Sequence, residues 1–323
     1  MSNLDQIAKL AGFSKATVSR VLNKSPHVSQ ETRSKILKIM QELDYVPNRN
    51  AVSLSKGQTL QIGIITSTIN EIVLAFLNSF VEVAAQYEFQ TIIYTSEEDK
   101  KKELQAFEDL KRKRVDALVI ISCVNDTDLL STYCKYGPIV SWQRMDHTDI
   151  RSVAMDQYEG YMLALKHLIQ KGYTRIANAF GRPSSINTHS RQRSYAYIME
   201  QHNLPVLQHW NQSSIYNIRD GEQVVRDLLQ YRDEFPQAIL CSNDYVAVGI
   251  FCEARRQLLS VPEDLAIVGF DNTELSHTMG ITTVQNPIEA QAQNAFYMLS
   301  PQLLGRQMEL HHLQYSLIER TTT

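Results

Sequence analysis

The sequence predicts a small all-α head over residues 1–46 and an α/β body with parallel sheets in two lobes over residues 58–323. The head shows helical spacing of apolar residues, whereas the body alternates short apolar runs with helical segments. Charge divides the chain at the same place. Residues 1–57 hold nine Lys/Arg against four Asp/Glu, a net charge of +5, so the rest carries −8 of the total −3. A basic head on an acidic body indicates that the head meets a polyanion.

The composition indicates a cytoplasmic protein. No run of about 18 uncharged apolar residues is present, and the N-terminus has no basic stretch followed by an apolar one, so we expect neither a membrane span nor secretion. The four cysteines form no C-x-x-C pair and are expected to be small core residues rather than metal ligands or disulfides. They are Cys123, Cys134, Cys241 and Cys252.

Three short helices are predicted in the head. Gly12 breaks the first, Ser14 can cap the second and Ser29 the third. A helix, a short glycine-containing turn and a second helix form the helix-turn-helix pattern. The positions expected to face inward are Leu4, Ile7, Ala8 and Ala11, then Val18, Val21 and Leu22, and finally Ile36, Met40 and Leu43.

The second helix is the one expected to enter the DNA major groove. Arg20 can pair with guanine, Lys15 can reach a base edge or a phosphate, and Ala16 can touch a thymine methyl group. Short polar side chains suited to phosphate contacts are Ser14, Thr17, Ser19 and Asn23. From periodicity alone, a plain three-helix bundle with a solvated basic face stays open.

The run Ile7–Asn23, IAKLAGFSKATVSRVLN, closely resembles the head of the lactose/galactose repressor family, as do the segments 28–33 and 43–48. The resemblance implies a homodimer that reads a palindromic operator in double-stranded DNA. It also gives residues 47–57 a role as a hinge helix that enters the minor groove, with Asn48, Ala51 and Leu54 contacting DNA. By itself the segment is too short for a stable helix, and a plain linker is the alternative.

In the body, apolar strands are predicted at 61–65, 91–94, 117–121, 139–142, 175–179, 238–241 and 265–268, with helices such as 76–87, 157–171 and 245–259 between them. This alternation is typical of parallel sheets covered on both faces. Segments 60–66, 238–249 and 261–272, together with Arg193-x-x-Ala196-Tyr197, resemble the family's sensor domain, which is similar to periplasmic sugar-binding proteins. We therefore expect an N-lobe of about 58–156 and 288–315, and a C-lobe of about 157–287 and 316–323.

Ligands of open parallel sheets bind beyond the carboxyl ends of the strands, where Ser242-Asn243-Asp244 and Gly269-Phe270-Asp271-Asn272 lie. Singly, each segment could be a turn or a helix cap. The resemblance implies an effector site for a sugar or sugar phosphate made by Ser67, Ile72, Gln143, Arg193, Tyr216, Asn243, Asp271 and Asn286. Gln143 departs from the family, which more often has an acidic or small residue there. His189 and Arg191 are interpreted as exposed loop residues, although they could suit a phosphorylated ligand.

The sequence thus predicts a dimeric transcriptional repressor of carbohydrate metabolism genes, controlled by a small sugar-like effector and using no cofactor or metal. An enzyme is not expected, since G-x-x-x-x-G-K-[ST], G-x-S-x-G and H-E-x-x-H motifs are missing. A sugar-binding transport protein is the alternative. Whether the effector releases or favours DNA binding stays open, as does control by a phosphorylated carrier protein.

Overall fold

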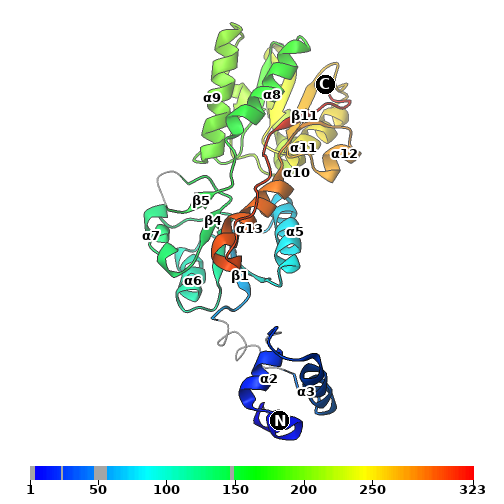
Figure 1. The fold of residues 1–323 in the computed structure, drawn as a ribbon. Helices are drawn as coiled ribbons and strands as arrows, with labels where there is room; N and C mark the ends of the chain where they lie inside the picture. The colour runs from blue at the N-terminus through cyan, green and yellow to red at the C-terminus, as the bar shows by residue number, and fades with distance from the viewer. Residues whose placement is uncertain (1–3, 23–24, 47–56, 146–148) are drawn as a thin grey trace.

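A computed structural model describes residues 4–22, 25–46, 57–145 and 149–323, as a head and a two-lobed body (Figure 1). The head contains α1 (Leu4–Ala11), α2 (Lys15–Leu22) and α3 (Gln30–Glu42), so the three predicted helices are confirmed. The expected hinge lies almost wholly outside the described residues.

Local chemistry sets the helix boundaries of the head. Gly12 has a φ of +73°, a left-handed conformation that favours glycine and ends α1. The Ser14 Oγ accepts a hydrogen bond from the Thr17 N–H at 3.1 Å, and the Ser29 Oγ accepts one from the Thr32 N–H at 3.2 Å. The buried side chains that these helices bring together are Ile7, Ala8, Ala11, Val18, Val21, Ile36 and Met40.

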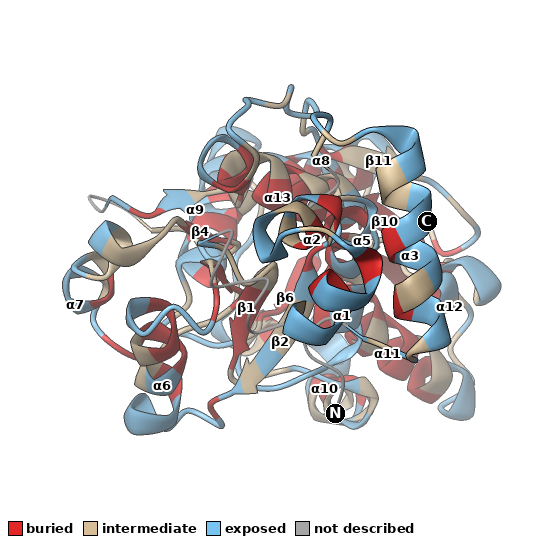
Figure 2. Ribbon diagram, turned by 60° about the horizontal axis from the view of Figure 1, so that its bottom comes forward, coloured by how far each residue is buried: buried red, intermediate tan, exposed pale blue. Residues whose placement is uncertain are grey.

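The first lobe is built on a five-stranded sheet of order β2-β1-β3-β4-β5, in which every pair is parallel. Its strands are β1 (Gln61–Thr66), β2 (Gln90–Thr95), β3 (Ala117–Ile120), β4 (Ile139–Ser141) and β5 (Arg151–Ser152). The segments between them form α5 (Glu71–Gln86), α6 (Lys100–Lys111), α7 (Thr127–Ser131) and η1 (Cys134–Tyr136). Helices on both faces bury the sheet, which explains the continuous apolar strands (Figure 2).

The second lobe is built on a six-stranded sheet of order β11-β10-β9-β8-β6-β7, parallel except for the pair β10–β11. Its strands are β6 (Ile176–Ala179), β7 (Asn211–Gln212), β8 (Ala238–Cys241), β9 (Ala266–Phe270), β10 (Thr282–Gln285) and β11 (Ser316–Ile318). Its helices are α8 (Gln157–Gln170), α9 (Ile186–Gln201), η2 (Gln208–Trp210), α10 (Ile218–Leu228), η3 (Leu229–Glu234), α11 (Asp244–Arg256) and α12 (Glu274–Thr278).

The chain passes between the lobes three times. It leaves the first lobe after β5, returns after β10 to form α13 (Ile288–Leu304), and crosses again to reach β11. Helix α13 packs against α5 and β4, and so belongs to the core of the first lobe. These crossings bring the carboxyl ends of both sheets to one junction, and the two-lobed α/β fold class is confirmed. Within the described ranges, every helix is too short or too polar to cross a membrane.

Candidate functional site

Helix α2 presents its polar face outward, as predicted. Lys15, Ala16 and Arg20 are exposed, whereas Val18 and Val21 are buried against the other two helices. Thr17 and Ser19 are half-buried, and Ser14 is exposed at the start of the helix. The remaining residues predicted to contact DNA, namely Asn23, Asn48, Ala51 and Leu54, lie outside the described residues.

One contact on this face involves the head's own first helix. The Lys15 Nζ donates a hydrogen bond to Asp5 Oδ2 at 2.8 Å, and the two side chains are 57% and 65% exposed. An exposed ion pair of this kind contributes little to stability and is readily exchanged for another anion. Lys15 therefore remains available to a phosphate or a base edge.

A polar cavity of about 440 Å³ lies where the two lobes meet. Its walls are the segments that follow the strands of both sheets, which is where ligands of parallel α/β folds bind. Seven of the eight residues expected to bind an effector line it, namely Ser67, Ile72, Gln143, Tyr216, Asn243, Asp271 and Asn286. The structure thus gathers side chains that lie far apart in the sequence.

Arg193 is the residue that the structure does not bring to this cavity, and the prediction needs correcting here. Its side chain is 65% exposed on the outer face of α9, where it pairs with Asp156 at 3.5 Å. Arg191, two residues earlier, lines the cavity and is buried. Successive helical residues are about 100° apart, so the two arginines point to nearly opposite sides. The interpretation of Arg191 as an exposed loop residue is likewise wrong, whereas His189 is exposed, but on α9 rather than in a loop.

Arg191 is held in a fixed orientation. Its Nε donates to Gln157 Oε1 at 2.8 Å and its Nη1 to the Ser242 carbonyl at 2.8 Å. The guanidinium also lies 4.2 Å from the centroid of the Phe270 ring. Two of its five N–H groups are used in these bonds, which leaves donors for a ligand. Burial lowers the pKa of Arg191, but an arginine so placed remains charged.

Asp271 follows β9 and supplies the only carboxylate among the described residues that line the cavity. Burial, followed by repulsion from Asp244, raises its pKa to about 7, although the Asn286 hydrogen bond and the Arg191 charge act in the opposite direction. Its φ is +103°, and that of Asn272 is +56°, both in a region that residues with side chains rarely adopt. Such backbone strain is concentrated at binding sites.

A chain of hydrogen bonds links Asp271 to the first lobe. Asn286 Nδ2 donates to Asp271 Oδ1 at 3.1 Å, and Gln291 Nε2 donates to Asn286 Oδ1 at 3.0 Å. The Gln291 Oε1 in turn accepts from the indole Nε1 of Trp142. Trp142 follows β4 and stacks on Phe76 of α5 at 4.6 Å between ring centroids. A ligand that contacts Asp271 is therefore coupled to the packing of the first lobe.

The first-lobe wall is neutral and rich in hydroxyl and amide groups. The Ser122 Oγ accepts from the Ser67 N–H at 2.8 Å, and Gln143 Oε1 accepts from the Cys123 N–H at 3.1 Å. These bonds orient the polar groups before any ligand arrives. With an arginine and an aspartate opposite, the cavity matches neighbouring hydroxyl groups on a small polar molecule.

Sequence reasoning missed Arg191, Trp142 and Gln291, all of which line the cavity. The sequence did contain a signal for Arg191. The pattern Arg191-x-x-Ser194-Tyr195 is similar to Arg193-x-x-Ala196-Tyr197, and its residues share a helical spacing with the apolar Ile198, with which they are buried. Trp142 and Gln291 had none, since their contact joins residues 149 positions apart.

The described residues offer no group of three or more His, Cys, Asp or Glu side chains that could hold a metal ion. The cavity is lined by polar groups suited to binding.

Two family models match the chain. Residues 3–48 match the bacterial regulatory proteins of the lacI family, and residues 165–323 match a periplasmic binding protein-like domain. The chain is 35% identical to the NTD biosynthesis operon regulator NtdR of Bacillus subtilis, with 94% of each chain covered. It is 32% identical to the HTH-type transcriptional regulator YkvZ of the same organism over the full length of both.

Among solved structures, a lac repressor dimer bound to operator and the anti-inducer ONPF has a TM-score of 0.86 and 26% identity, covering 99% of this chain and 98% of that one. The agreement extends over head and body together. The chain belongs to the lacI family of bacterial regulatory proteins.

Proposed function

We propose that the protein is a sequence-specific repressor of carbohydrate metabolism genes, which acts as a homodimer and is controlled by a small sugar or sugar phosphate. The observation that carries this proposal is the combination, in one chain, of a helix that exposes Arg20 and Lys15 with a polar cavity at the junction of two lobes. A ligand in such a junction can favour one arrangement of the lobes, and so alter DNA binding, if its affinity differs between the two states.

A homodimer is supported by apolar side chains on the surface of the first lobe. On α5, Leu74 is 46% exposed and Val81 is 40% exposed, seven residues apart on one helix face. Ile93, 43% exposed, lies on the adjacent edge strand β2. A second copy would bury these side chains, and its two-fold axis would match a palindromic operator.

The effector class is supported by the cavity wall. Asp271 and Arg191 can bind neighbouring hydroxyl groups in a bidentate manner, while Trp142 and Tyr216 offer apolar ring faces. Arg182, which also lines the cavity, provides a second cation that would suit a phosphate. We keep the predicted domain boundaries of 1–46, 47–57 and 58–323, and a regulator of this kind would act in the cytoplasm.

The proposal is tested by selecting duplexes from a random pool with the purified full-length chain, with and without sugars and sugar phosphates. We expect enrichment of a symmetric site and a change in affinity with at least one compound. Arg20→Ala should lower affinity for the selected site by about 1–3 kcal/mol and relax base preference at one position of each half-site. Recovery of random sequence under all conditions would refute the proposal.

A further inference from the structure

We propose that the end of the first lobe at which the chain enters from the head is a second DNA-binding surface, which contacts backbone phosphates of the duplex that the head reads. We call this surface the basic rim; it comprises Lys111, Arg112, Lys113, Arg114 and Lys135. The proposal rests on the proposed function, and its experiment separates the two.

The basic rim lies where the chain enters the body. Gln58 Nε2 donates to the Leu303 carbonyl at 2.9 Å, and the Thr59 N–H donates to Asp116 Oδ1 at 2.9 Å, which fixes the entering segment against the lobe. Lys113 lines the same shallow pocket as Gly57 and Gln58. This is the amino end of the first sheet, and Figure 1 shows it at the opposite end of the lobe from the second lobe.

The basic rim is within reach of DNA bound by the head. Ten residues, 47–56, separate the described head from the described body. At no more than about 3.6 Å per residue, they span at most about 36 Å, which is close to one turn of duplex. When the head is bound to DNA, the body is therefore held near the same duplex, with the basic rim at the end closest to it.

The charge of the basic rim is opposite to that of the body around it. The body carries −8 in total, yet the described segments 111–116 and 134–138 hold five cations, against three carboxylates in or beside them, namely Asp116 and the ion-pair partners Glu108 and Asp109. Asp116 accepts the backbone N–H groups of Thr59 and Leu60. Arg112 and Arg114 are 69% and 66% exposed, whereas Asp109, the partner of Arg114, is 9% exposed. Glu108, which pairs with Lys111 and Arg112, is 33% exposed, so the cations project further into solvent than the carboxylates and the surface keeps a net positive charge that suits phosphate binding.

The backbone at Lys113 gives an independent argument. Helix α6 ends in a Schellman motif, with the Lys113 N–H bonded to the Leu110 carbonyl at 3.1 Å and the Arg114 N–H to the Asp109 carbonyl at 2.8 Å. Lys113 holds the left-handed position, with a φ of +56°, where glycine is the usual residue. A lysine there is conformationally unfavourable, so the left-handed backbone does not account for its presence.

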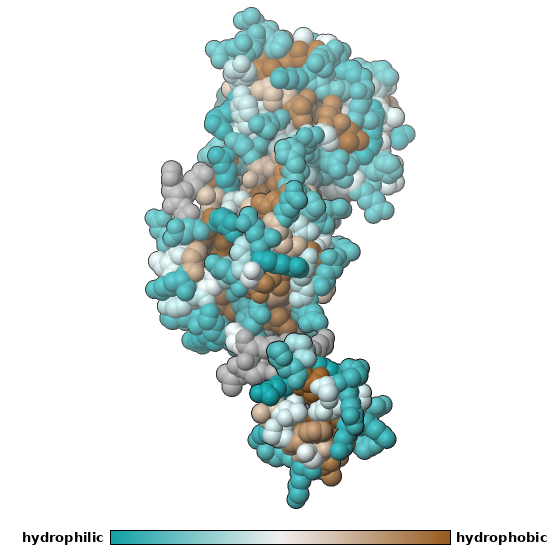
Figure 3. All heavy atoms as spheres, in the orientation of Figure 1, coloured by the Kyte–Doolittle hydropathy of each residue, from teal (hydrophilic) through white to brown (hydrophobic). Residues whose placement is uncertain are grey.

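Its ammonium group donates to the Tyr136 carbonyl, and the amine of Lys135 lies 5.1 Å from the centroid of the Tyr136 ring. Both cations are thereby brought to one loop. Figure 3 shows hydrophilic side chains over the α6 side of the lobe.

Helix α6 supplies a matched control. Lys100 and Lys101 begin the helix at the opposite end, near the interlobe junction, and both are exposed. The double variants R112Q/K113Q and K100Q/K101Q each remove two positive charges, the first just after the C-terminus of α6 and the second at its N-terminus. Overall net charge is therefore equal in the two variants, and they differ only in the end of the lobe that loses charge.

Affinity would be measured by fluorescence anisotropy between about 50 and 200 mM salt, on the selected site alone and on the site extended by one and a half turns, about 15 base pairs, on each side. We expect R112Q/K113Q to bind the extended duplex roughly fivefold or more weakly, with a salt dependence shallower by about one for each lost phosphate contact. K100Q/K101Q should match the unaltered protein.

Equal affinity and equal salt dependence of the two double variants would overturn the proposal that the basic rim binds DNA. This is also the result expected if the rim binds an acidic protein instead. Failure of the unaltered protein to prefer any selected site would overturn the proposed function itself.

Lys113→Gly separates binding from folding. Glycine suits the left-handed position, which offsets the loss of the hydrogen bond from the Lys113 ammonium to the Tyr136 carbonyl, so the thermal unfolding temperature should change little. The affinity for the extended duplex should nevertheless decrease. If unfolding temperature falls while DNA affinity is unchanged, Lys113 has a structural role only.

Discussion

Asp271 directly follows the buried strand β9 and lines the cavity. Its carboxyl group is therefore next to the apolar core on one side and accessible to a ligand on the other. Thr283 and the backbone of Thr273 satisfy the nearby Asp244 carboxylate, whereas the side-chain oxygens of Asp271 have the Asn286 amide as their only partner among the described residues. The Asp271 carboxyl group is therefore poorly solvated and available to ligand hydroxyls. Such a group lowers the stability of the fold in favour of binding.

Asp271→Asn should stabilise the effector-free protein at pH 8. The pKa of Asp271 is about 7 in the folded state and near 3.9 in the unfolded state. The buried charge therefore destabilises the folded protein fully above pH 7 and not at all below about pH 4. The gain should be about 1–3 kcal/mol, less than the ~4 kcal/mol of full desolvation because the group is partly solvated. Chemical denaturation at pH 4, 6 and 8 should show that the stability gained by Asp271→Asn grows with pH. The variant should also lose its response to the effector. A gain independent of pH would contradict this assignment.

Arg191 and Arg193 lie on the same helix, α9, but only Arg191 is among the described residues that line the cavity, so the same substitution can be compared at both positions. Arg191→Lys keeps the charge but loses the planar fork that bonds Gln157 and the Ser242 carbonyl. Effector affinity, measured by calorimetry, should fall about 10- to 100-fold, equivalent to 1.4–2.8 kcal/mol for charge-assisted hydrogen bonds. Arg193→Lys should leave it unchanged. The reverse result would restore Arg193 as the effector contact.

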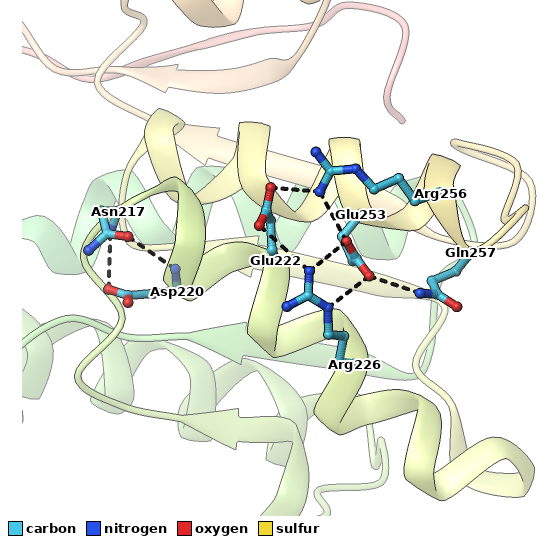
Figure 4. Close-up of polar contacts among 7 residues, drawn as sticks. All are labelled: Asn217, Asp220, Glu222, Arg226, Glu253, Arg256 and Gln257. Atoms are coloured by element: carbon cyan, nitrogen blue, oxygen red, sulfur yellow. Dashed lines mark hydrogen bonds and ion pairs between the residues drawn. The ribbon is translucent and has the colours of Figure 1, made fainter.

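At the scale of elements, α10 and α11 are joined by a network of charges centred on Glu253 (Figure 4). Arg226 Nε and Nη2 donate to the two Glu253 oxygens at 2.9 and 3.0 Å, and Gln257 Nε2 donates at 2.8 Å. Arg256 bridges Glu253 and Glu222. Gly221 and Gly249 let the helices meet closely, since a Cβ on Gly249 would lie 2.0 Å from the Ile218 carbonyl oxygen.

Glu253→Gln should weaken this helix pair by about 1 kcal/mol at pH 7, a modest value because Arg226 and Arg256, which pair with the buried Glu253 carboxylate, are 45% and 58% exposed to solvent. The Arg226 hydrogen bonds lower the pKa of Glu253 to about 2. Its contribution to stability is therefore complete above about pH 4.5 and is lost as the pH falls toward 2. Denaturation at pH 7 and pH 3 should show the difference between the two proteins narrowing. Asp227→Asn, which removes a carboxylate of α10 that accepts a hydrogen bond from the Gln223 side chain, is the control.

At the scale of the whole molecule, an ion pair joins the two lobes beside the cavity, which Arg182 lines. Arg182, after β6, donates to Glu98 Oε1 of the first lobe at 2.9 Å, and both side chains are more than half exposed. The loop that carries Glu98 is tied to the end of β1, since the Ser96 N–H bonds the Thr66 carbonyl and the Glu97 N–H bonds the Ser67 carbonyl. The pair therefore connects one lobe with the other.

Glu98→Gln should weaken the binding of an uncharged sugar, because the ion pair with Arg182 favours the arrangement that encloses the cavity. An exposed pair contributes little, so we expect a decrease of about 1.5- to 5-fold at low salt that disappears near 1 M salt, where charges are screened. Titration of the effector at several salt concentrations checks this. A loss that persists at high salt would show that Glu98 acts by another route than its charge.

Local patterns in the sequence were sufficient for the head helices, for the alternation of strands and helices, and for two polar segments of the cavity wall, whereas the other predicted wall residues came from the resemblance to the family. Strands buried on both faces leave a continuous apolar run, and parallel strands place the residues after them at one edge, so Asn243 and Asp271 could be located from their positions alone.

The tertiary structure decided what local patterns leave undetermined. Arg191 and Arg193 differ only in the side of α9 from which they project, and packing of that helix selects the one that faces the cavity. The contacts of Trp142 with Gln291 and of Glu98 with Arg182 join residues 149 and 84 positions apart. Such pairs depend on how separate elements pack together, and no periodicity within either segment encodes that arrangement.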